Sequence, residues 1–265
     1  MIVLAVCVVL GAGLWRTLSY DAILKATKEC DYERLERLCS IPFANRDIRL
    51  DRDFIDMMFA RPGNETPLEV ACSNGDIVAA EILLRHGANP NARHPFGSRS
   101  SCLSWGICRG DVALVKLLIQ YGAKKDEGEN GLQTYVVRWK NGMDGSLEQF
   151  ADMYRLIDTW HGVSPEEKNG ILGNAAFCCN IEVTQFLIEQ CGASLSMTDE
   201  QGKTVLHRCS GAGNAAEEDQ IAYVDYVLAH SSVDLSTRDD TGKTAYDYAV
   251  ENNKAELAKR LKIAD

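Results

Sequence analysis

The sequence lacks the short motifs that identify most enzymes and metal-binding proteins. No HExxH, GxSxG or GxxxxGK[ST] pattern occurs in its 265 residues, so nothing indicates a zinc protease, a serine hydrolase or a P-loop enzyme. Its ten cysteines form no CxxC pair and none of the paired spacings of zinc fingers. We therefore expect no catalytic residue, no bound metal and no cofactor, and we expect that the protein is not an enzyme.

Positive charge is also scarce. Lys and Arg number 28 against 38 Asp and Glu, which gives a net charge of −10, and no basic run forms a stripe. Because binding to phosphates needs clustered positive charge, we expect no nucleic acid partner. The apolar share of 46% and the charged share of 25% are ordinary for a chain that buries a core.

The cysteines lie mostly within apolar helical patterns, where a free thiol packs as a small hydrophobic group. A chain of this length does not need a disulfide framework to fold. We therefore interpret them as reduced core thiols in a cytosolic protein, with disulfides in a secreted protein as the alternative. The adjacent Cys178 and Cys179 are the most unusual pair, and we interpret them as a core contact on a repeat helix.

The chain begins with an apolar run, IVLAVCVVLGAGLW at positions 2–15, which contains no charged or polar side chain. A membrane-spanning helix needs roughly 17–25 residues, and the run approaches this length if it continues to Leu18 while Arg16 extends toward the membrane surface. A cleaved signal peptide is the second interpretation. A strand that opens a nucleotide-binding fold is the third, and it is disfavoured because Arg16 stands where the dinucleotide fingerprint needs glycine.

We favour a hydrophobic helix within residues 1–19 that attaches the protein to a membrane through residues 2–18. Basic residues follow the apolar run at 2–15 and none precedes it: Arg16, Lys25, Lys28 and Arg34. The positive-inside tendency then keeps the rest of the chain in the cytoplasm. A cytoplasmic protein without an anchor and a secreted protein are the alternatives.

A repeated pattern begins at Thr66. The segment TPLEVACSNGD continues to LLRHGANPNA, and its anchors at positions 66, 75 and 87 recur at 101, 110 and 122. Two further openings, DEQGKT at 199–204 and DDTGKT at 239–244, lie 40 residues apart. A repeat of this length with these openings resembles the ankyrin-repeat family, whose unit of about 33 residues opens with TPLH.

Elementary chemistry explains several anchors. Thr66 can cap the free N–H groups of a helix, and Pro67 is tolerated in the first turn. Gly75 is expected to end that helix, because glycine adopts a left-handed backbone without strain. The resemblance implies that His207, at the His of TPLH, orders its turn through local hydrogen bonds.

The resemblance implies an all-α fold, an ankyrin-repeat α-solenoid of stacked helix-turn-helix units with short hairpin connections. The N-terminal hydrophobic helix would precede it. The expected organisation is a hydrophobic segment at 1–19, N-terminal cap helices and an insertion at 20–60, and about five repeats at 61–265. Within the repeats, 126–170 is degenerate and 244–265 is a C-terminal cap.

Two other features invite a functional interpretation that we do not favour. The acidic clusters Glu166–Glu167 and Glu217–Asp219 lack the alternating spacing of a calcium loop, so we interpret them as solvated surface. The glycine-containing run at 211–216 follows a helix rather than a strand, which predicts a loop between helices rather than a phosphate site.

The resemblance implies a monomeric scaffold that binds a protein partner on its concave face and hairpin tips. The candidate patch combines Arg93 and Phe96 at one hairpin tip with Trp105 and Arg109 on the next first helix, and Trp and Arg dominate binding hot spots. Packing over the neighbouring repeat is the alternative role for Trp105. A secreted effector or immunity factor stays open as a function. So does an enzymatic activity hidden in 126–170, which would need a deep polar pocket with an activated His or Cys.

Overall fold

The computed structural model of the chain describes residues 21–41, 66–91, 101–125, 131–140, 145–212 and 215–262. The regular elements in these ranges are helices, and the ranges contain no strand. The predicted all-α fold class is therefore confirmed. The chain divides into two compact units, Met1–Glu129 (unit 1) and Asn130–Asp265 (unit 2).

Several predicted features lie outside the described residues. They include the hydrophobic segment at 1–19, the insertion that follows residue 41, and the hairpin tip with Arg93 and Phe96. Over the ranges that the structure describes, no helix is long and apolar enough to span a bilayer. The hydrophobic helix and membrane attachment through residues 2–18 therefore stay predictions.

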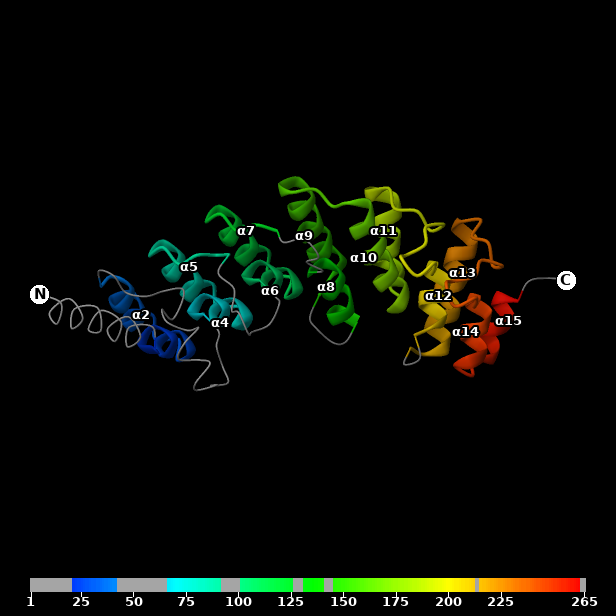
Figure 1. Cartoon of the computed structure of the whole chain (residues 1–265), viewed down its shortest axis with the longest axis horizontal. Helices are drawn as coiled ribbons and strands as arrows, with labels where there is room; N and C mark the ends of the chain where they lie inside the picture. The colour runs from blue at the N-terminus through cyan, green and yellow to red at the C-terminus, as the bar shows by residue number, and fades with distance from the viewer. Residues whose placement is uncertain are drawn as a thin grey trace, which may run out of the picture. The chain divides into compact units, whose positions relative to one another are not determined.

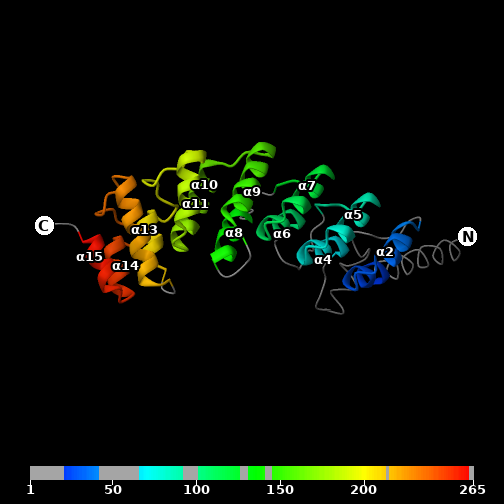
Figure 2. The same ribbon diagram turned by 180° about the vertical axis from the view of Figure 1, so that it is seen from behind.

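Unit 1 is built from short helices that pair and stack (Figure 1). After a helical stretch at 21–28 come α2 (Tyr32–Cys39), α4 (Pro67–Asn74), α5 (Ile77–Arg85), α6 (Cys102–Cys108) and α7 (Val112–Gln120). In each pair α4 packs on α5 and α6 on α7, while along the stack α4 packs on α6 and α5 on α7 (Figure 2). This is the stacking of helix-turn-helix units that the 35-residue spacing predicts.

Unit 2 contains the same kind of stack. Its helices are α8 (Gly131–Lys140), α9 (Leu147–Trp160), α10 (Pro165–Phe177), α11 (Ile181–Cys191), α12 (Val205–Ser210), α13 (Glu217–His230), α14 (Ala245–Glu251) and α15 (Ala255–Leu261). The first helices form a row in which α8 packs on α10, α10 on α12 and α12 on α14. Among the second helices, α9 packs on α11 and α13 on α15.

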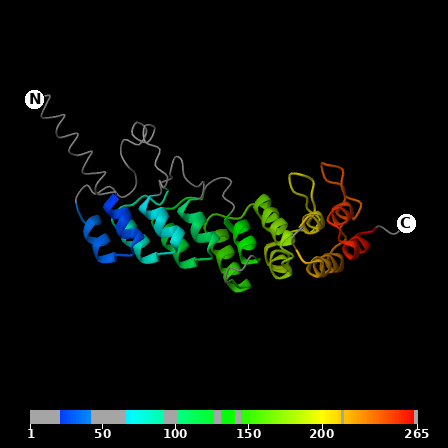
Figure 3. The ribbon, with the colours of Figure 1, turned by 90° about the horizontal axis from the view of Figure 1, so that it is seen from below.

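The connections that precede α12 and α14 project from the same side of unit 2, where Figure 3 draws them in yellow and orange. They are joined by a backbone hydrogen bond, in which the N–H of Asp240 donates to the carbonyl of Gln201 at 3.0 Å. The two connections therefore lie side by side, next to the first helices α12 and α14 that they precede.

Reciprocal hydrogen bonds cap several of the first helices. In α4 the hydroxyl of Thr66 accepts the N–H of Glu69 at 3.1 Å, while the Glu69 carboxylate accepts the N–H of Thr66 at 2.6 Å. The same exchange links Ser164 with Glu167 and Thr244 with Asp247. The capping role predicted for Thr66 is confirmed, and a cap of this kind contributes about 1 kcal/mol.

A residue with a left-handed backbone joins the two helices of several pairs. Gly75 (φ +74°) and Gly110 (φ +70°) hold this position in unit 1, and Cys179 (φ +53°) holds it in unit 2. The next residue in each case caps the second helix through its side chain: Asp76, Asp111 and Asn180. The prediction that Gly75 ends a helix is therefore confirmed.

Small side chains fill the space between the paired helices of unit 1. Ala71 of α4 and Ala79 and Ala80 of α5 are fully buried, as is Leu83. Their small volume lets the helices approach closely, and the buried area supplies the hydrophobic stabilisation of the stack.

An aromatic cluster forms the core at the beginning of unit 2. Tyr135 of α8 stacks on Phe150 of α9 with ring centroids 5.8 Å apart. Phe186 of α11 meets Phe150 edge-on at 5.8 Å and Tyr154 edge-on at 5.6 Å. Because Tyr135 and Phe150 are fully buried, the segment with degenerate sequence still contains a packed helix pair.

Nine of the cysteines are described, and all nine are free thiols. Six are buried: Cys39, Cys72, Cys102, Cys108, Cys178 and Cys209. Cys179 and Cys191 are half-buried, and Cys30 is exposed. The interpretation as core thiols therefore holds for these six and not for Cys30, Cys179 and Cys191. The interpretation of Cys178 and Cys179 as a core contact on a repeat helix is right for the buried Cys178 alone, because α10 ends at Phe177 and Cys179 lies in the left-handed turn that follows.

Candidate functional site

The described half of the predicted patch lies on α6 of unit 1. Trp105 is half-buried and Arg109, the C-cap of α6, is exposed. Arg109 Nη1 donates to the carbonyl of Ser73 at 3.1 Å, and its guanidinium lies over Gly75, where an added Cβ would come within 2.7 Å of Nη2. A cation at the end of α4 is favourable because the last carbonyls of a helix carry partial negative charge. Arg109 therefore stabilises the contact between α4 and α6.

Arg93 and Phe96 lie outside the described residues, so their grouping with Trp105 and Arg109 stays a prediction. The structure gives Arg109 a second role that the sequence did not indicate, because Ser73 and Gly75 belong to the preceding repeat. A loss of binding on replacement of Arg109 would therefore need a separate measurement of folding.

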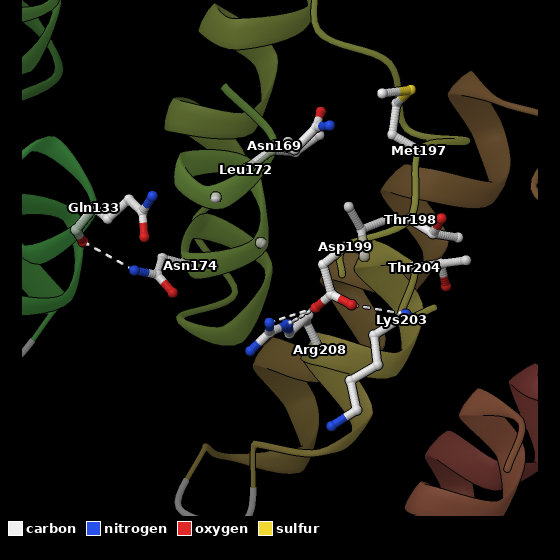
Figure 4. Close-up of a pocket in the computed structure, with 13 residues that line it drawn as sticks. Gln133, Asn169, Leu172, Asn174, Met197, Thr198, Asp199, Lys203, Thr204 and Arg208 are labelled. Atoms are coloured by element: carbon white, nitrogen blue, oxygen red, sulfur yellow. Dashed lines mark hydrogen bonds and ion pairs between the residues drawn. The ribbon is translucent and has the colours of Figure 1, made fainter. Parts of the chain in front are cut away.

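A second surface, in unit 2, was not predicted. Side chains from α8, α10 and α12 and from the connection before α12 line a groove, which Figure 4 shows. It consists of a hollow of about 180 Å³ and an adjoining hollow of about 350 Å³ that share much of their lining. We name this surface the amide groove and define it by six residues: Gln133, Asn169, Gly170, Gly173, Asn174 and Arg208.

Helix α10 forms the floor of the amide groove. Gly170 and Gly173 lie three residues apart in the helix, on one face, so α10 itself places no side chain there. An added Cβ at Gly170 would lie 2.1 Å from Nε2 of Gln133, which places the Gln133 amide directly against the α10 backbone. Each glycine costs about 1 kcal/mol of helix stability relative to alanine, so the two glycines lower the intrinsic helix propensity of α10.

The amide side chains of the groove differ in their partners. Asn174 Nδ2 donates to the backbone carbonyl of Gln133 at 3.2 Å and so ties α10 to α8. The side-chain amides of Gln133 and Asn169 make no hydrogen bond with any residue that the structure describes. Each of these amides offers donors and an acceptor to a ligand.

Asp199 positions the basic side chain of the groove. Arg208 Nε donates to Asp199 Oδ2 at 2.8 Å, and Nη2 contacts the same oxygen. Asp199 Oδ1 accepts the backbone N–H groups of Gln201 and Lys203, each at 2.9 Å. Burial raises the pKa of Asp199, but these N–H groups and Arg208 lower it by more, so the pKa lies below its usual range.

His207 has the structural role that the resemblance implies. The N–H of Thr204 donates to Nδ1 at 3.1 Å, so the ring proton lies on Nε2, which donates to the carbonyl of Lys243 at 3.1 Å. Burial lowers the pKa of His207 by more than the Lys243 hydrogen bond raises it, and the imidazole is neutral at pH 7. His207 thus links two successive repeats.

The acidic clusters also have structural partners, which corrects their interpretation as solvated surface in part. Glu167 closes the cap with Ser164, and Glu217 Oε1 accepts the N–H groups of Glu256 at 2.9 Å and Leu257 at 3.1 Å. Glu166 and Glu218 are exposed, as predicted. The order Ser164-Pro165-x-Glu167 repeats the Thr-Pro-x-Glu opening of α4, and this was the signal that would have identified another repeat.

The two hollows lie partly against the 126–170 region, through Gln133, Glu166, Asn169 and Gly170. The side chains that line the two hollows include no histidine and no cysteine. No group of three or more His, Cys, Asp or Glu side chains in the described ranges could hold a metal ion. The two hollows present amides, the paired Arg208 and Asp199, and the charged side chains of Lys203, Glu166 and Glu200, which suit recognition by hydrogen bonds and charge.

Comparison with family models identifies the same repeat at two places. The model described as "Ankyrin repeats (3 copies)" matches residues 172–265, and the model described as "Ankyrin repeat" matches residues 63–95. Two solved structures are similar in fold at low sequence identity. The human ASB11 ankyrin repeat domain has a TM-score of 0.64 at 20% identity and covers 92% of this chain and 98% of its own. The ankyrin repeat domain of Bcl-3, a member of the IkappaB family, has a TM-score of 0.56 at 16% identity and covers 90% and 97%.

One relative among known proteins is a membrane channel by name. The "Transient receptor potential cation channel subfamily A member 1 homolog" of Caenorhabditis elegans is 26% identical over 255 residues, which cover 92% of this chain and 19% of that protein. The chain thus spans about a fifth of the length of this relative.

Proposed function

Because the chain is an ankyrin-repeat protein, we propose that it is a protein-interaction scaffold that binds an extended segment of a partner in the amide groove. Repeats of this kind stack into an extended surface, and such surfaces bind other proteins. The observation that carries the proposal is the pair of side-chain amides, Gln133 and Asn169, which make no hydrogen bond with a described residue and lie beside Gly170 and Gly173 of α10.

The chemistry of the groove matches a polypeptide backbone. A peptide group offers one N–H donor and one carbonyl acceptor, and a Gln or Asn side chain complements both at once. At Gly173 no Cβ separates a partner backbone from α10, while at Gly170 the flexible Gln133 amide occupies this space and would itself meet the partner. Arg208 uses Nε and Nη2 for Asp199, so its remaining N–H groups are available to a carbonyl or carboxylate of the partner.

Site-specific photo-crosslinking tests this proposal. A photoreactive residue is introduced at Thr198, at the exposed edge of the groove, or at Gln185, which is exposed on α11. We expect proteins that crosslink from position 198 and not from position 185, and we expect the paired substitutions Gln133→Ala and Asn169→Ala to remove them while the fold is retained. Identical crosslinked proteins from both positions, or crosslinks that survive the paired substitutions, would overturn the proposal.

The predicted patch of unit 1 is a second contact region that we propose for the same function. Its support is the half-buried Trp105 beside the exposed Arg109, a combination typical of interface hot spots, together with Arg93 and Phe96 in the preceding connection. Replacement of Trp105 and Phe96 by alanine should weaken partner capture if the patch is used. Arg109 is left in place, because it also stabilises α4.

We further propose membrane attachment through residues 2–18, with the repeats as a cytoplasmic monomer. The support is the uncharged run at 2–15 and the basic residues that follow it. Fractionation of the intact, C-terminally tagged chain tests this. A tag in the membrane fraction that external protease cannot reach agrees with it, whereas a soluble or secreted product shortened at its N-terminus would contradict it.

A further inference from the structure

Two thiols from different helices meet in unit 2. The sulfur of Cys179, in the turn after α10, lies 3.7 Å from the sulfur of Cys209 in α12. The two residues are 30 positions apart in the sequence and meet because α10 packs on α12. A disulfide needs the sulfurs at about 2.05 Å, so the two sulfurs must approach each other before a bond can form.

Cys179 occupies a position that favours glycine. Its backbone is left-handed, with φ at +53°, and the corresponding residues of unit 1 are Gly75 and Gly110. A side chain at such a position is unfavourable, because Cβ crowds the following carbonyl. Cys30 has the same backbone, with φ at +54°, but its exposed thiol contacts Tyr32 rather than a second thiol. Cys30 is thus an unpaired thiol in the same kind of turn.

The two sulfurs differ in access and in acidity. Cys179 is half-buried, whereas Cys209 is fully buried. The hydrogen bond with Cys209 lowers the pKa of Cys179, and the charges of Lys140 and Lys254 add to this, while burial and Asp219 act against it. The same contact and burial raise the pKa of Cys209.

The neighbouring thiol has neither property. Burial raises the pKa of Cys178 to about 11, and its side chain is closed to solvent. Of Cys178, Cys179 and Cys209, Cys179 is therefore the thiol that an oxidant can reach in its reactive, deprotonated form.

We propose that Cys179 and Cys209 form a disulfide when the protein meets a peroxide, and that this bond joins α10 to α12. The Cys179 thiolate attacks one peroxide oxygen, the O–O bond breaks, and Cys179 becomes a sulfenic acid as hydroxide leaves. Cys209 loses its proton to that hydroxide, its sulfur attacks the sulfur of Cys179, and the S–O bond breaks with release of a second hydroxide, which takes up a proton from solvent. In total, two thiols and one hydrogen peroxide give one disulfide and two waters.

The bond would join the turn after α10 to α12, and both helices line the amide groove. Gly170 and Gly173 belong to α10, and Arg208, the residue before Cys209, belongs to α12. Oxidation would fix the distance between the floor of the groove and its basic side. The disulfide itself does not depend on the proposed function, so failure of either proposal leaves the other intact.

Non-reducing peptide mapping tests the inference. The full-length chain is reduced, treated with hydrogen peroxide, unfolded, alkylated and digested with trypsin, which places Cys209 in the peptide 209–238 and Cys178 and Cys179 together in the peptide 169–203. The peptide 169–203 also contains Cys191, so a second cleavage after Glu182 separates it. We expect the dominant disulfide to join the peptide with Cys179 to the peptide with Cys209.

Two variants make the assignment unambiguous. Cys178→Ala is the matched control next to the pair, and the bond should persist in it. Cys179→Gly removes the thiol and relieves the left-handed strain, so this variant should fold and should not form the bond. Cys30 should stay alkylatable throughout.

Three results would overturn the inference. The first is a wild-type protein in which Cys209 remains alkylatable after peroxide treatment while Cys179 is further oxidised. The second is a first disulfide between another pair, such as Cys72 and Cys102. The third is loss of the bond in the Cys178→Ala variant.

Discussion

Arg208 and Tyr248 stand at the same position of two successive repeats, and each binds the aspartate nine residues before it. Arg208 Nε donates to Asp199 at 2.8 Å, and the Tyr248 hydroxyl donates to Asp239 at 2.7 Å. In both repeats the other carboxylate oxygen accepts backbone N–H groups of the connection, which include that of Lys203 or Lys243. The same hydrogen-bonded aspartate therefore orders both connections. Its side-chain partner is the Arg208 guanidinium in one repeat and the Tyr248 hydroxyl in the next.

Tyr248→Phe removes the hydroxyl that donates to Asp239 and keeps the aromatic ring. A hydrogen bond to a charged group contributes about 1.5–3 kcal/mol, so we expect the free energy of unfolding to fall by about 2 kcal/mol in urea denaturation. The control is Tyr246→Phe, because Tyr246 is on the same helix and 37% exposed. That variant should stay within about 0.5 kcal/mol of the wild type. An equal loss in both variants would show that the contact with Asp239 does not stabilise the fold.

The stability of unit 2 should depend on pH through Asp239. Burial raises the pKa of this carboxyl, but hydrogen bonds from Thr241, Tyr248 and the backbone of Lys243 lower it by more, so the pKa lies below its usual range. A group with a depressed pKa in the folded state contributes stability above its unfolded pKa of about 3.9, and this contribution is lost as pH falls through the folded value.

We therefore expect the free energy of unfolding to fall between about pH 5 and pH 2, and the Asp239→Asn variant to show a smaller fall. Denaturation at a series of pH values measures both. Asp225→Asn is the control, because Asp225 pairs with Arg260 at the surface and its side chain is 43% exposed. If the free energy of unfolding of Asp239→Asn falls with pH as steeply as that of the wild type, Asp239 is not the source of the pH dependence.

The contribution of Arg109 to stability can be measured by comparing alanine substitutions at Gly75, which Arg109 covers, and at Gly87, which nothing covers. Both have left-handed backbones, with φ at +74° and +88°, but an added Cβ meets Arg109 Nη2 at 2.7 Å at position 75 and meets nothing within 4 Å at position 87. We expect Gly87→Ala to cost about 1 kcal/mol for the backbone alone. Gly75→Ala should cost about 1 kcal/mol more, because Arg109 must leave the Ser73 carbonyl.

The free energy of unfolding of both glycine variants is measured by denaturation, with Arg109 present and with the Arg109→Ala substitution. The difference gives the coupling energy between each glycine position and Arg109. The extra cost at position 75 should disappear once Arg109 is absent. If it persists, the contact seen in the structure does not contribute to stability.

The features that could be predicted from the sequence are those that neighbouring residues determine. Thr66 and Glu69 cap a helix across three residues, and Gly75 ends the same helix through its own backbone. His207 was identified by its place in the repeat opening, and its bond to Thr204 also spans three residues. Such short-range chemistry leaves a direct pattern in the sequence.

The features that escaped prediction depend on contacts between repeats. Arg109 reaches Ser73 across 36 residues, and Cys179 meets Cys209 across 30. The amide groove has no motif, because Gln133 and Gly170 become neighbours only when α8 packs on α10. The opening at Ser164 could have been found, but the paired glutamates suggested an exposed acidic cluster instead.

The glycines of α10 allow binding in the groove to be separated from stability. Gly173→Ala adds a Cβ whose nearest neighbour is Arg208 Nε at 3.8 Å, an ordinary contact, so the variant should gain about 1 kcal/mol of helix stability. Gly170→Ala places a Cβ 2.1 Å from Gln133 Nε2, so the flexible Gln133 side chain must move, which offsets part of the same gain. Both variants put a methyl group on the floor of the amide groove.

If a partner backbone lies against α10, both alanine variants should lose photo-crosslinking from position 198 although neither is less stable than the wild type. Urea denaturation and crosslinking yield are measured on the same preparations. Gln185→Ala on α11 is the control, because it also changes an exposed helical residue but lies outside the groove. Full crosslinking by a stabilised Gly173→Ala variant would mean that no partner approaches the backbone of α10. If binding needs the glycines of α10, the alanine variants lose binding although the protein becomes more stable. A general defect in folding would lower both binding and stability.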